Sequence, residues 1–330
     1  MPALANVALI RLTARPGPAL IVGLLALLAA AIATAFLTIG ARGRWDFVLA
    51  FRGTKLAAMV LVGVAVATAA VLFQTIARNR ILTPSIMGFD ALYGLIQTGT
   101  VFLLGARGLG FGDPRLAFAV EAGTMIGFAL LLYGWLLADG RRSLHLMLLV
   151  GVVLGAIFRS LASFMGRMID PAEFVVLQQR LFANFNAVRG DLLLPTCLAV
   201  SAVLLVVARL LPRLDVLLLG REAAIGLGVD HRRSVFLVII LVSILVSVST
   251  ALVGPVTFLG LLVANLAYML VPSYRHVYVL PAAALLAVVA LVGGQLALER
   301  LFALDAVLPV VIEFVGGIVL IALLVRTGRR

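Results

Sequence analysis

The sequence predicts an all-α polytopic membrane protein with about ten transmembrane helices. Of its 330 residues, 64% are hydrophobic and only 12% are charged, and the mean hydropathy is +1.21. Soluble domains contain about 45–50% apolar and about 25% charged residues, so this composition argues against a soluble fold. A helix that spans the hydrocarbon core needs about 20 apolar residues, so a chain of this length has room for about ten spans.

Ten uncharged or nearly uncharged runs follow one another along the chain. A helix satisfies its own backbone hydrogen bonds in lipid, and nothing resembles the alternating strands of a membrane barrel. The run at 256–271 is short for a full span, and glycine and proline in "TPSIMG" and "GPVTFLG" indicate broken helices. The predicted spans are 17–39, 54–76, 87–105, 116–137, 143–164, 191–211, 234–253, 256–271, 278–298 and 307–326. We expect residues 1–330 to form one transmembrane domain.

The distribution of positive charge predicts the orientation of these spans. Arg11 and Arg15 precede the first run, which lacks an obvious cleavage site, so we interpret this run as an uncleaved first span. A cytoplasmic N-terminus places 15 of the 26 Lys and Arg residues on the cytoplasmic side. Cytoplasmic loops retain positive residues, so we expect both termini in the cytoplasm.

A polar stretch between two spans, "LGREAAIGLGVDHRR", is too short to be a domain and too polar to cross a membrane. It lies in a predicted cytoplasmic loop at about 212–233. Its small residues, among them Ala223, Ala224, Gly226 and Gly228, suggest that something packs closely against a short helix. A solvated loop with one helical turn is the simpler alternative.

The sequence lacks the motifs of the common catalytic sites. It has no G-x-x-x-x-G-K-[ST] phosphate loop, no H-E-x-x-H and no G-x-S-x-G, and Lys55 is its single lysine. His145, His231 and His276 are far apart in sequence, and Cys197 is the single cysteine. We therefore expect a protein that performs no chemistry and contains no metal site.

A few polar residues at membrane depth are candidates for a translocation path. Gln74, Arg159 and Asn265 are our candidates. Polar groups between helices more often serve as hydrogen-bonding glue, and Arg159 could instead extend toward the membrane surface. Glu313 keeps a second function open, that of an ion-coupled secondary transporter with a midplane carboxylate site.

The segment "STALVGPVTFLGLLVANLAYMLVPSYRHVYVLPAAALLA" resembles the signature block of FecCD-type, BtuC-like permeases, the membrane subunits of ABC importers for ferric siderophores, haem and vitamin B12. Ala264 and Asn265 replace the usual Pro-His pair. "NRILTPSIMGFDALYGLIQT" is similar to the heterodimeric ferric-siderophore subfamily (FatC/YclO-like). The matching residues of the signature block are Gly254, Pro255, Phe258, Gly260, Leu261, Arg275, His276, Leu280 and Pro281.

This resemblance implies a type II ABC importer permease in the cytoplasmic (inner) membrane. It implies a paralogous second permease, two ATPase subunits, a periplasmic or lipid-anchored binding protein and an iron-chelate substrate. The chain itself would need no cofactor, since ATP and Mg would bind to the partner ATPase. The residues expected to couple the chain to the ATPase are Leu219, Gly220, Arg221, Glu222, Ala224, Leu227 and Gly228.

The resemblance also assigns residues at the two membrane faces. Arg52, Lys55 and Arg300 match the basic positions onto which the acidic binding protein docks, and anchoring at the membrane interface is the alternative. Ser143, Leu144 and His145 align with the constriction at the cytoplasmic gate, and capping of a helix by Ser143 is the simpler alternative.

Overall fold

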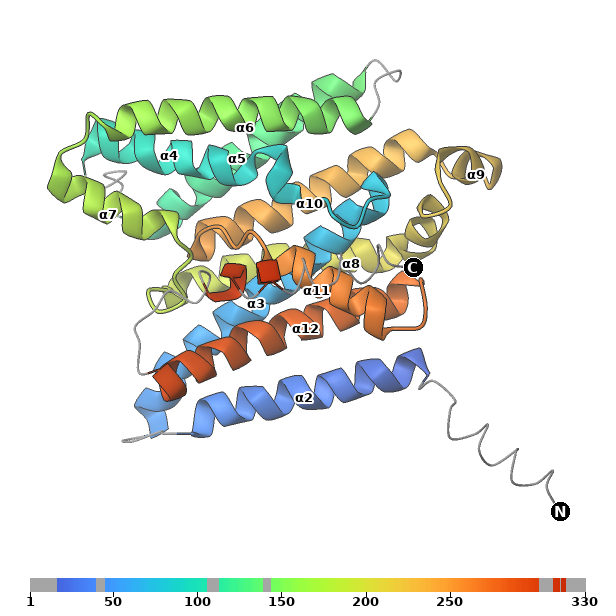
Figure 1. Ribbon diagram of the computed structural model, residues 1–330, viewed down its shortest axis with the longest axis horizontal. Coiled ribbons are helices and arrows are strands. Elements are labelled where there is room, and N and C mark those ends of the chain that lie inside the picture. Colours follow the sequence, from blue (N-terminus) through green and yellow to red (C-terminus); the bar gives the residue numbers. More distant parts are fainter. Residues whose placement is uncertain are drawn as a thin grey trace.

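A computed structural model describes residues 17–39, 45–105, 113–138, 144–302, 311–314 and 316–318. Within these ranges the chain is helical and contains no strand. The long helices run roughly along one common axis (Figure 1). Their bounds are α2 Pro18–Thr38, α3 Trp45–Ala77, α4 Phe89–Leu104, α5 Pro114–Ala138, α6 Leu144–Gly166, α8 Leu193–Leu217, α10 His231–Val253, α11 Leu259–Leu270 and α12 His276–Ala297. Within the described residues, five short helices connect them or extend α12: η1 Pro84–Met87, α7 Pro171–Leu181, η2 Gly190–Leu192, α9 Arg221–Gly226 and η3 Leu298–Phe302.

Each predicted apolar run contains a helix where the structure describes it, although 256–258 of the run 256–271 precede α11 and are not helical. Among the residues that the structure describes, seven helices are long and apolar enough to cross a membrane, and α4 and α11 are shorter apolar helices. Only 311–314 and 316–318 of the predicted last span lie within the described residues. The segment predicted as a loop at about 212–233 contains the end of α8, which continues through Pro212 to Leu217, as well as α9.

The helices differ strongly in how much of their surface the chain itself covers. The apolar windows of α3 and α10 are 67% and 72% buried, whereas those of α2 and α6 are only 17% buried. The former pair therefore forms the centre of the bundle, and α2 and α6 lie at its periphery, facing lipid or another subunit.

Small residues allow the central helices to approach one another closely. A Cβ added at Gly63 of α3 would lie 3.3 Å from the Cβ of Ala287 on α12. One added at Gly260 of α11 would lie 2.9 Å from the Cβ of Ala70 on α3. In lipid, helices associate mainly through such van der Waals contacts and interhelical hydrogen bonds, so these glycines favour the packing.

Two breaks in the helices fall where the sequence has glycine and proline. Gly88, with φ 88°, separates η1 from α4, and Gly254, with φ 99°, ends α10. The hydroxyl of Tyr133 donates to the carbonyl of Met87 at 3.0 Å, and the amide of Asn184 donates to the carbonyl of Val253 at 2.7 Å. Both broken backbones are thus covered by protein, as the absence of water in a bilayer requires.

The contact at Gly260 leads to a test of the packing. We expect Gly260→Val to lower the free energy of unfolding by about 1–3 kcal/mol, because its side chain would collide with Ala70 and Val66. Thermal unfolding of the detergent-solubilised protein measures this change. Gly123→Ala in α5 is the control, since no atom lies within 4 Å of an added Cβ there. Equal melting temperatures for the Gly260 variant and the wild type would contradict the inferred packing.

Candidate functional site

Helix α9 lies at one end of the bundle, at the end opposite to α7 (Figure 1). It begins after Gly220, with φ 102°, and Gly228, with φ 79°, follows it, so both flanking positions favour glycine. Ala224 faces the chain itself and is fully buried. Leu219, Ile225 and Leu227 point outward and are 61%, 56% and 62% exposed. These apolar side chains form an exposed surface at the end of the bundle, next to the exposed Arg221 and Glu222.

The small residues of this stretch therefore have different surroundings. The sequence suggested that they allow a partner to pack closely, yet Ala224 packs within the chain, and no atom lies within 4 Å of a Cβ added at Gly226 or Gly228. Gly220 is tightly covered, since an added Cβ would lie 3.0 Å from the guanidinium of Arg78. Arg78 follows the last residue of α3, so this contact joins the central helix to the start of α9.

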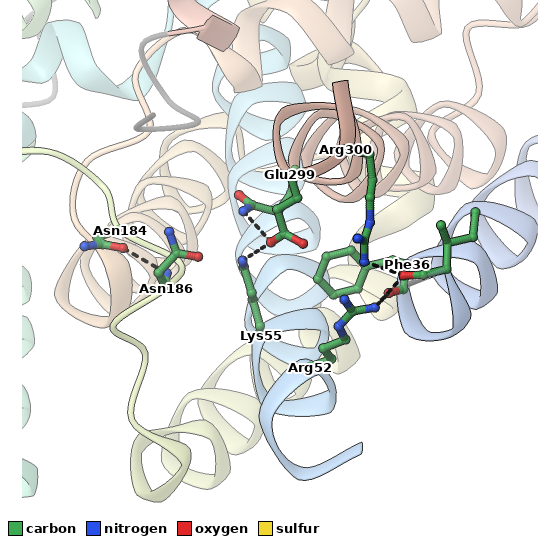
Figure 2. A network of polar contacts seen from close by, with 9 residues as sticks. Phe36, Arg52, Lys55, Asn184, Asn186, Glu299 and Arg300 are labelled. Carbon is green, nitrogen blue, oxygen red and sulfur yellow. Dashed lines mark hydrogen bonds and ion pairs between the residues drawn. The ribbon is translucent and has the colours of Figure 1, made fainter. Parts of the chain in front are cut away.

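A cluster of polar contacts lies at the other end of α3 and α12 (Figure 2). Lys55 is only 7% exposed and pairs with Glu299, which also accepts a hydrogen bond from the amide of Gln295 at 2.8 Å. The guanidinium of Arg52 donates to the carbonyls of Phe36 and Ile39, both at 2.9 Å. These carbonyls belong to the last turn of α2 and the residue after it, where the helix provides no partner.

The three predicted docking cations thus come together, each with a partner inside the chain. Arg300 donates to the carbonyl of Ile39, which Arg52 also contacts, so two guanidinium groups cap α2. Phe36 is almost fully buried beside Arg52 and Lys55, whose charged ends lie 5.9 and 5.8 Å from the centre of its ring. The sequence did not predict these contacts. Docking onto a binding protein stays a prediction for all three cations.

The predicted path residues do not form one group. The side-chain amides of Gln74 and Asn265 both donate to the carbonyl of Arg80, at 2.9 and 3.0 Å, and so fix the segment after α3. The guanidinium of Arg80 lies over the ring of Tyr268, 4.5 Å from its centre. Arg159, in contrast, is exposed on α6. The arrangement favours the interhelical hydrogen-bonding alternative for Gln74 and Asn265.

The gate prediction falls largely on residues that the structure does not describe. Ser143 lies outside the described residues, and Leu144 and His145 are in the first turn of α6, with side chains outside the description. Within the described part of the chain, no group of three or more His, Cys, Asp or Glu side chains is placed to hold a metal ion.

A buried network that sequence reasoning missed ties three helices together near α9. Nδ1 and the backbone amide of His276, at the start of α12, lie 2.6 and 2.8 Å from one carboxylate oxygen of Asp215 in α8. Nε2 of the same ring lies 2.8 Å from the hydroxyl of Thr75 in α3. The available signal was Asp215 itself, which is the single acidic residue between Asp191 and Glu222.

The chain is similar to known transport proteins. The FecCD transport family matches residues 17–326. The petrobactin import system permease protein YclO of Bacillus subtilis is 45% identical over 287 residues, which cover 87% of this chain and 91% of that protein. FatC, the corresponding permease of Bacillus anthracis, is 36% identical over 278 residues, which cover 83% and 78%.

A solved structure has the same fold. The inward-facing structure of a putative metal-chelate type ABC transporter matches with a TM-score of 0.82. The match has 22% sequence identity and covers 93% of this chain and 99% of that one.

The pair of Lys55 and Glu299 gives a testable coupling energy. We expect both Lys55→Met and Glu299→Gln to lower the melting temperature. Glu299→Gln leaves the buried ammonium group of Lys55 without its counter-charge, and Lys55→Met leaves the half-buried carboxylate of Glu299 without its cation. The double variant is expected to lose less unfolding free energy than the two single variants lose together, by about 0.5–3 kcal/mol. Thermal unfolding of the four proteins in detergent measures this difference. Additive losses would show that the two side chains do not stabilise each other.

Proposed function

The chain belongs to the FecCD transport family, and we propose that it is the membrane permease of an ATP-driven importer for a ferric siderophore. Family membership rests on a match that covers almost the whole chain. The observation that supports the cargo most directly is the 45% identity to a petrobactin import permease over 87% of the chain. The permease moves the iron chelate across the cytoplasmic membrane and performs no chemical step itself.

The proposal needs a motor from outside the chain, since the sequence has no phosphate loop. Two ATPase subunits bind ATP and Mg and drive the transporter between outward-open and inward-open states. In this proposal α9 is the surface that the ATPase contacts, through Leu219, Ile225 and Leu227. The contact of Arg78 with Gly220 then links movements of α9 to α3.

A second, paralogous permease completes the pathway in this proposal. FatC and FatD of Bacillus anthracis are both petrobactin import permeases, and this chain is 36% and 27% identical to them, which supports a heterodimer. The termini and α9 lie in the cytoplasm. A binding protein delivers the chelate at the opposite end, where Arg52 and Arg300 retain N–H donors beyond those bonded to α2.

Reconstitution tests the proposed transport directly. Proteoliposomes are assembled with this permease, its paralogue, the ATPase and the binding protein, and uptake of radiolabelled ferric petrobactin is followed. We expect uptake that requires both the binding protein and ATP on the side of the membrane that carries the ATPase. An ATPase variant that cannot hydrolyse ATP is the control. Uptake driven by an ion gradient without ATP would instead support the ion-coupled transporter.

The role of α9 has its own test. We expect Leu227→Asp to weaken copurification of the ATPase by about tenfold or more, since a charge in an apolar interface costs at least about 1.4 kcal/mol. Val175→Asp on α7, at the other end of the bundle, is the matched control, because Val175 is similarly exposed at 58%. Wild-type copurification of the Leu227 variant, together with full transport, would show that α9 is not the contact. Ala224 is unsuitable for this test because it is buried.

A further inference from the structure

Helix α6 carries two arginines that have no partner in the described chain. Arg159 lies inside the apolar span 146–166, and Arg167 directly follows the end of α6. Both side chains are exposed. Among the residues that the structure describes, neither guanidinium forms a hydrogen bond or an ion pair. This distinguishes them from Arg52 and Arg300, whose guanidinium groups are bound to α2.

An arginine that faces lipid at this depth would be costly. Insertion of an arginine at the centre of a membrane helix costs about 2.5–3.5 kcal/mol, and such residues nearly always face protein or a water-filled cavity. Arg159 lies seven residues from the end of the span, about 10 Å at the helical rise of 1.5 Å per residue. A polar space beside the face of α6 that bears Arg159 would spare the chain this cost.

The structure has hollows of suitable size on this face. Arg159, Ser163 and Arg167 follow one another at four-residue intervals, which places them along one side of the helix. A hollow of about 490 Å³ is lined by all three, and one of about 620 Å³ between α4, α6 and α7 shares Ser163 and Arg167 with it. Binding sites for small ligands usually have about 300–1,000 Å³.

The lining of these hollows is positive and rich in hydrogen-bond donors. No acidic residue lines either of them. Ser160 and Gln178 add polar groups, and Phe174 and Leu177 of α7 form an apolar wall. Guanidinium groups bind carboxylate and other oxyanion groups through paired, charge-assisted hydrogen bonds and stay charged at every physiological pH.

We propose that Arg159, Ser163 and Arg167 form an anion-binding subsite for the negatively charged oxygens of the iron chelate. This inference rests on the proposed function and adds the residues that recognise the charge of the cargo. Catecholate and carboxylate groups give a ferric chelate a net negative charge, which two unpartnered arginines match. The subsite lies toward the end of α6 that meets α7, far from α9 (Figure 1). In the proposed function, this is the end at which the cargo enters. An anionic lipid headgroup offers similar oxygens, so the experiment separates the two.

The test uses the complete transporter in proteoliposomes of zwitterionic phosphatidylcholine. The probe is a radiolabelled ferric chelate with catecholate groups, presented on the binding protein. We expect the double variant Arg159→Gln/Arg167→Gln to raise the KM for uptake by about tenfold or more, equivalent to about 1.4 kcal/mol. Basal ATPase activity and copurification of the subunits should persist. Arg159→Lys/Arg167→Lys should recover much of the loss, because it restores both charges.

Two further proteins keep the outcome interpretable. Arg115→Gln removes an exposed cation at the start of α5, outside both hollows, and should leave the KM unchanged. The single variant Arg167→Gln replaces the double variant in the test if the double variant does not assemble, because Arg167 lies beyond the span. It should raise the KM by several-fold.

An unchanged KM in an assembled Gln variant, or an equal rise in Arg115→Gln, would overturn the subsite. The subsite would also be overturned if anionic lipid copurified with the wild-type transporter and was lost from the Gln variants while chelate uptake in phosphatidylcholine was unaffected. Absence of chelate uptake by the wild-type transporter would overturn the proposed function, and the subsite with it.

Discussion

Close contact between α3 and the helices around it is the constraint on which the rest of the structure depends. Gly63 and Ala70 of α3 meet Ala287 of α12 and Gly260 of α11 at distances that leave little room for a larger side chain. Lipid is as apolar as the helix surfaces, so burial of apolar area supplies little driving force between helices. Close packing of small residues, together with the few polar contacts, must then determine which helices become neighbours.

The same packing explains how the bundle tolerates two broken helices. The interruptions at Gly88 and Gly254 leave backbone groups without a partner in their own helix, and lipid cannot bind them. Tyr133 and Asn184 donate hydrogen bonds to the carbonyls beside these breaks. Further contacts join segments at the two ends of the bundle. At one end Arg78 covers the glycine before α9, and at the other end two arginines cap α2.

The division between central and peripheral helices also sets where partners can bind. Contacts within the chain cover most of α3 and α10, whereas α2 and α6 expose long apolar faces. An apolar face alone suits lipid or protein equally well. Arg159 distinguishes one face of α6, because an unpaired charge within the span favours water or a polar partner over lipid. α9 is different again, since Ile225 of this helix and the flanking Leu219 and Leu227 are exposed at the end of the bundle.

The sequence by itself determined the class of fold, the position of the apolar helices and the presence of a short polar segment between two of them. Hydropathy and run length suffice for this, because the bilayer acts on each helix separately. It did not determine which side of each helix faces its own chain. Ala224 looked like a contact for a partner and is buried inside, while Ile225 and Leu227 face outward.

Only the tertiary structure decided which polar residues meet. Lys55 pairs with Glu299 across 244 positions of sequence, and Asp215 meets His276 across 61. The side chain of Asn265 meets the backbone of Arg80, a contact that no side-chain motif encodes. Such contacts depend on how helices rotate and pack against each other, and in a chain with so few charges each polar residue has few possible partners. The sequence therefore limits which polar residues could pair, and the packing of α3 with its neighbours decides which of them do.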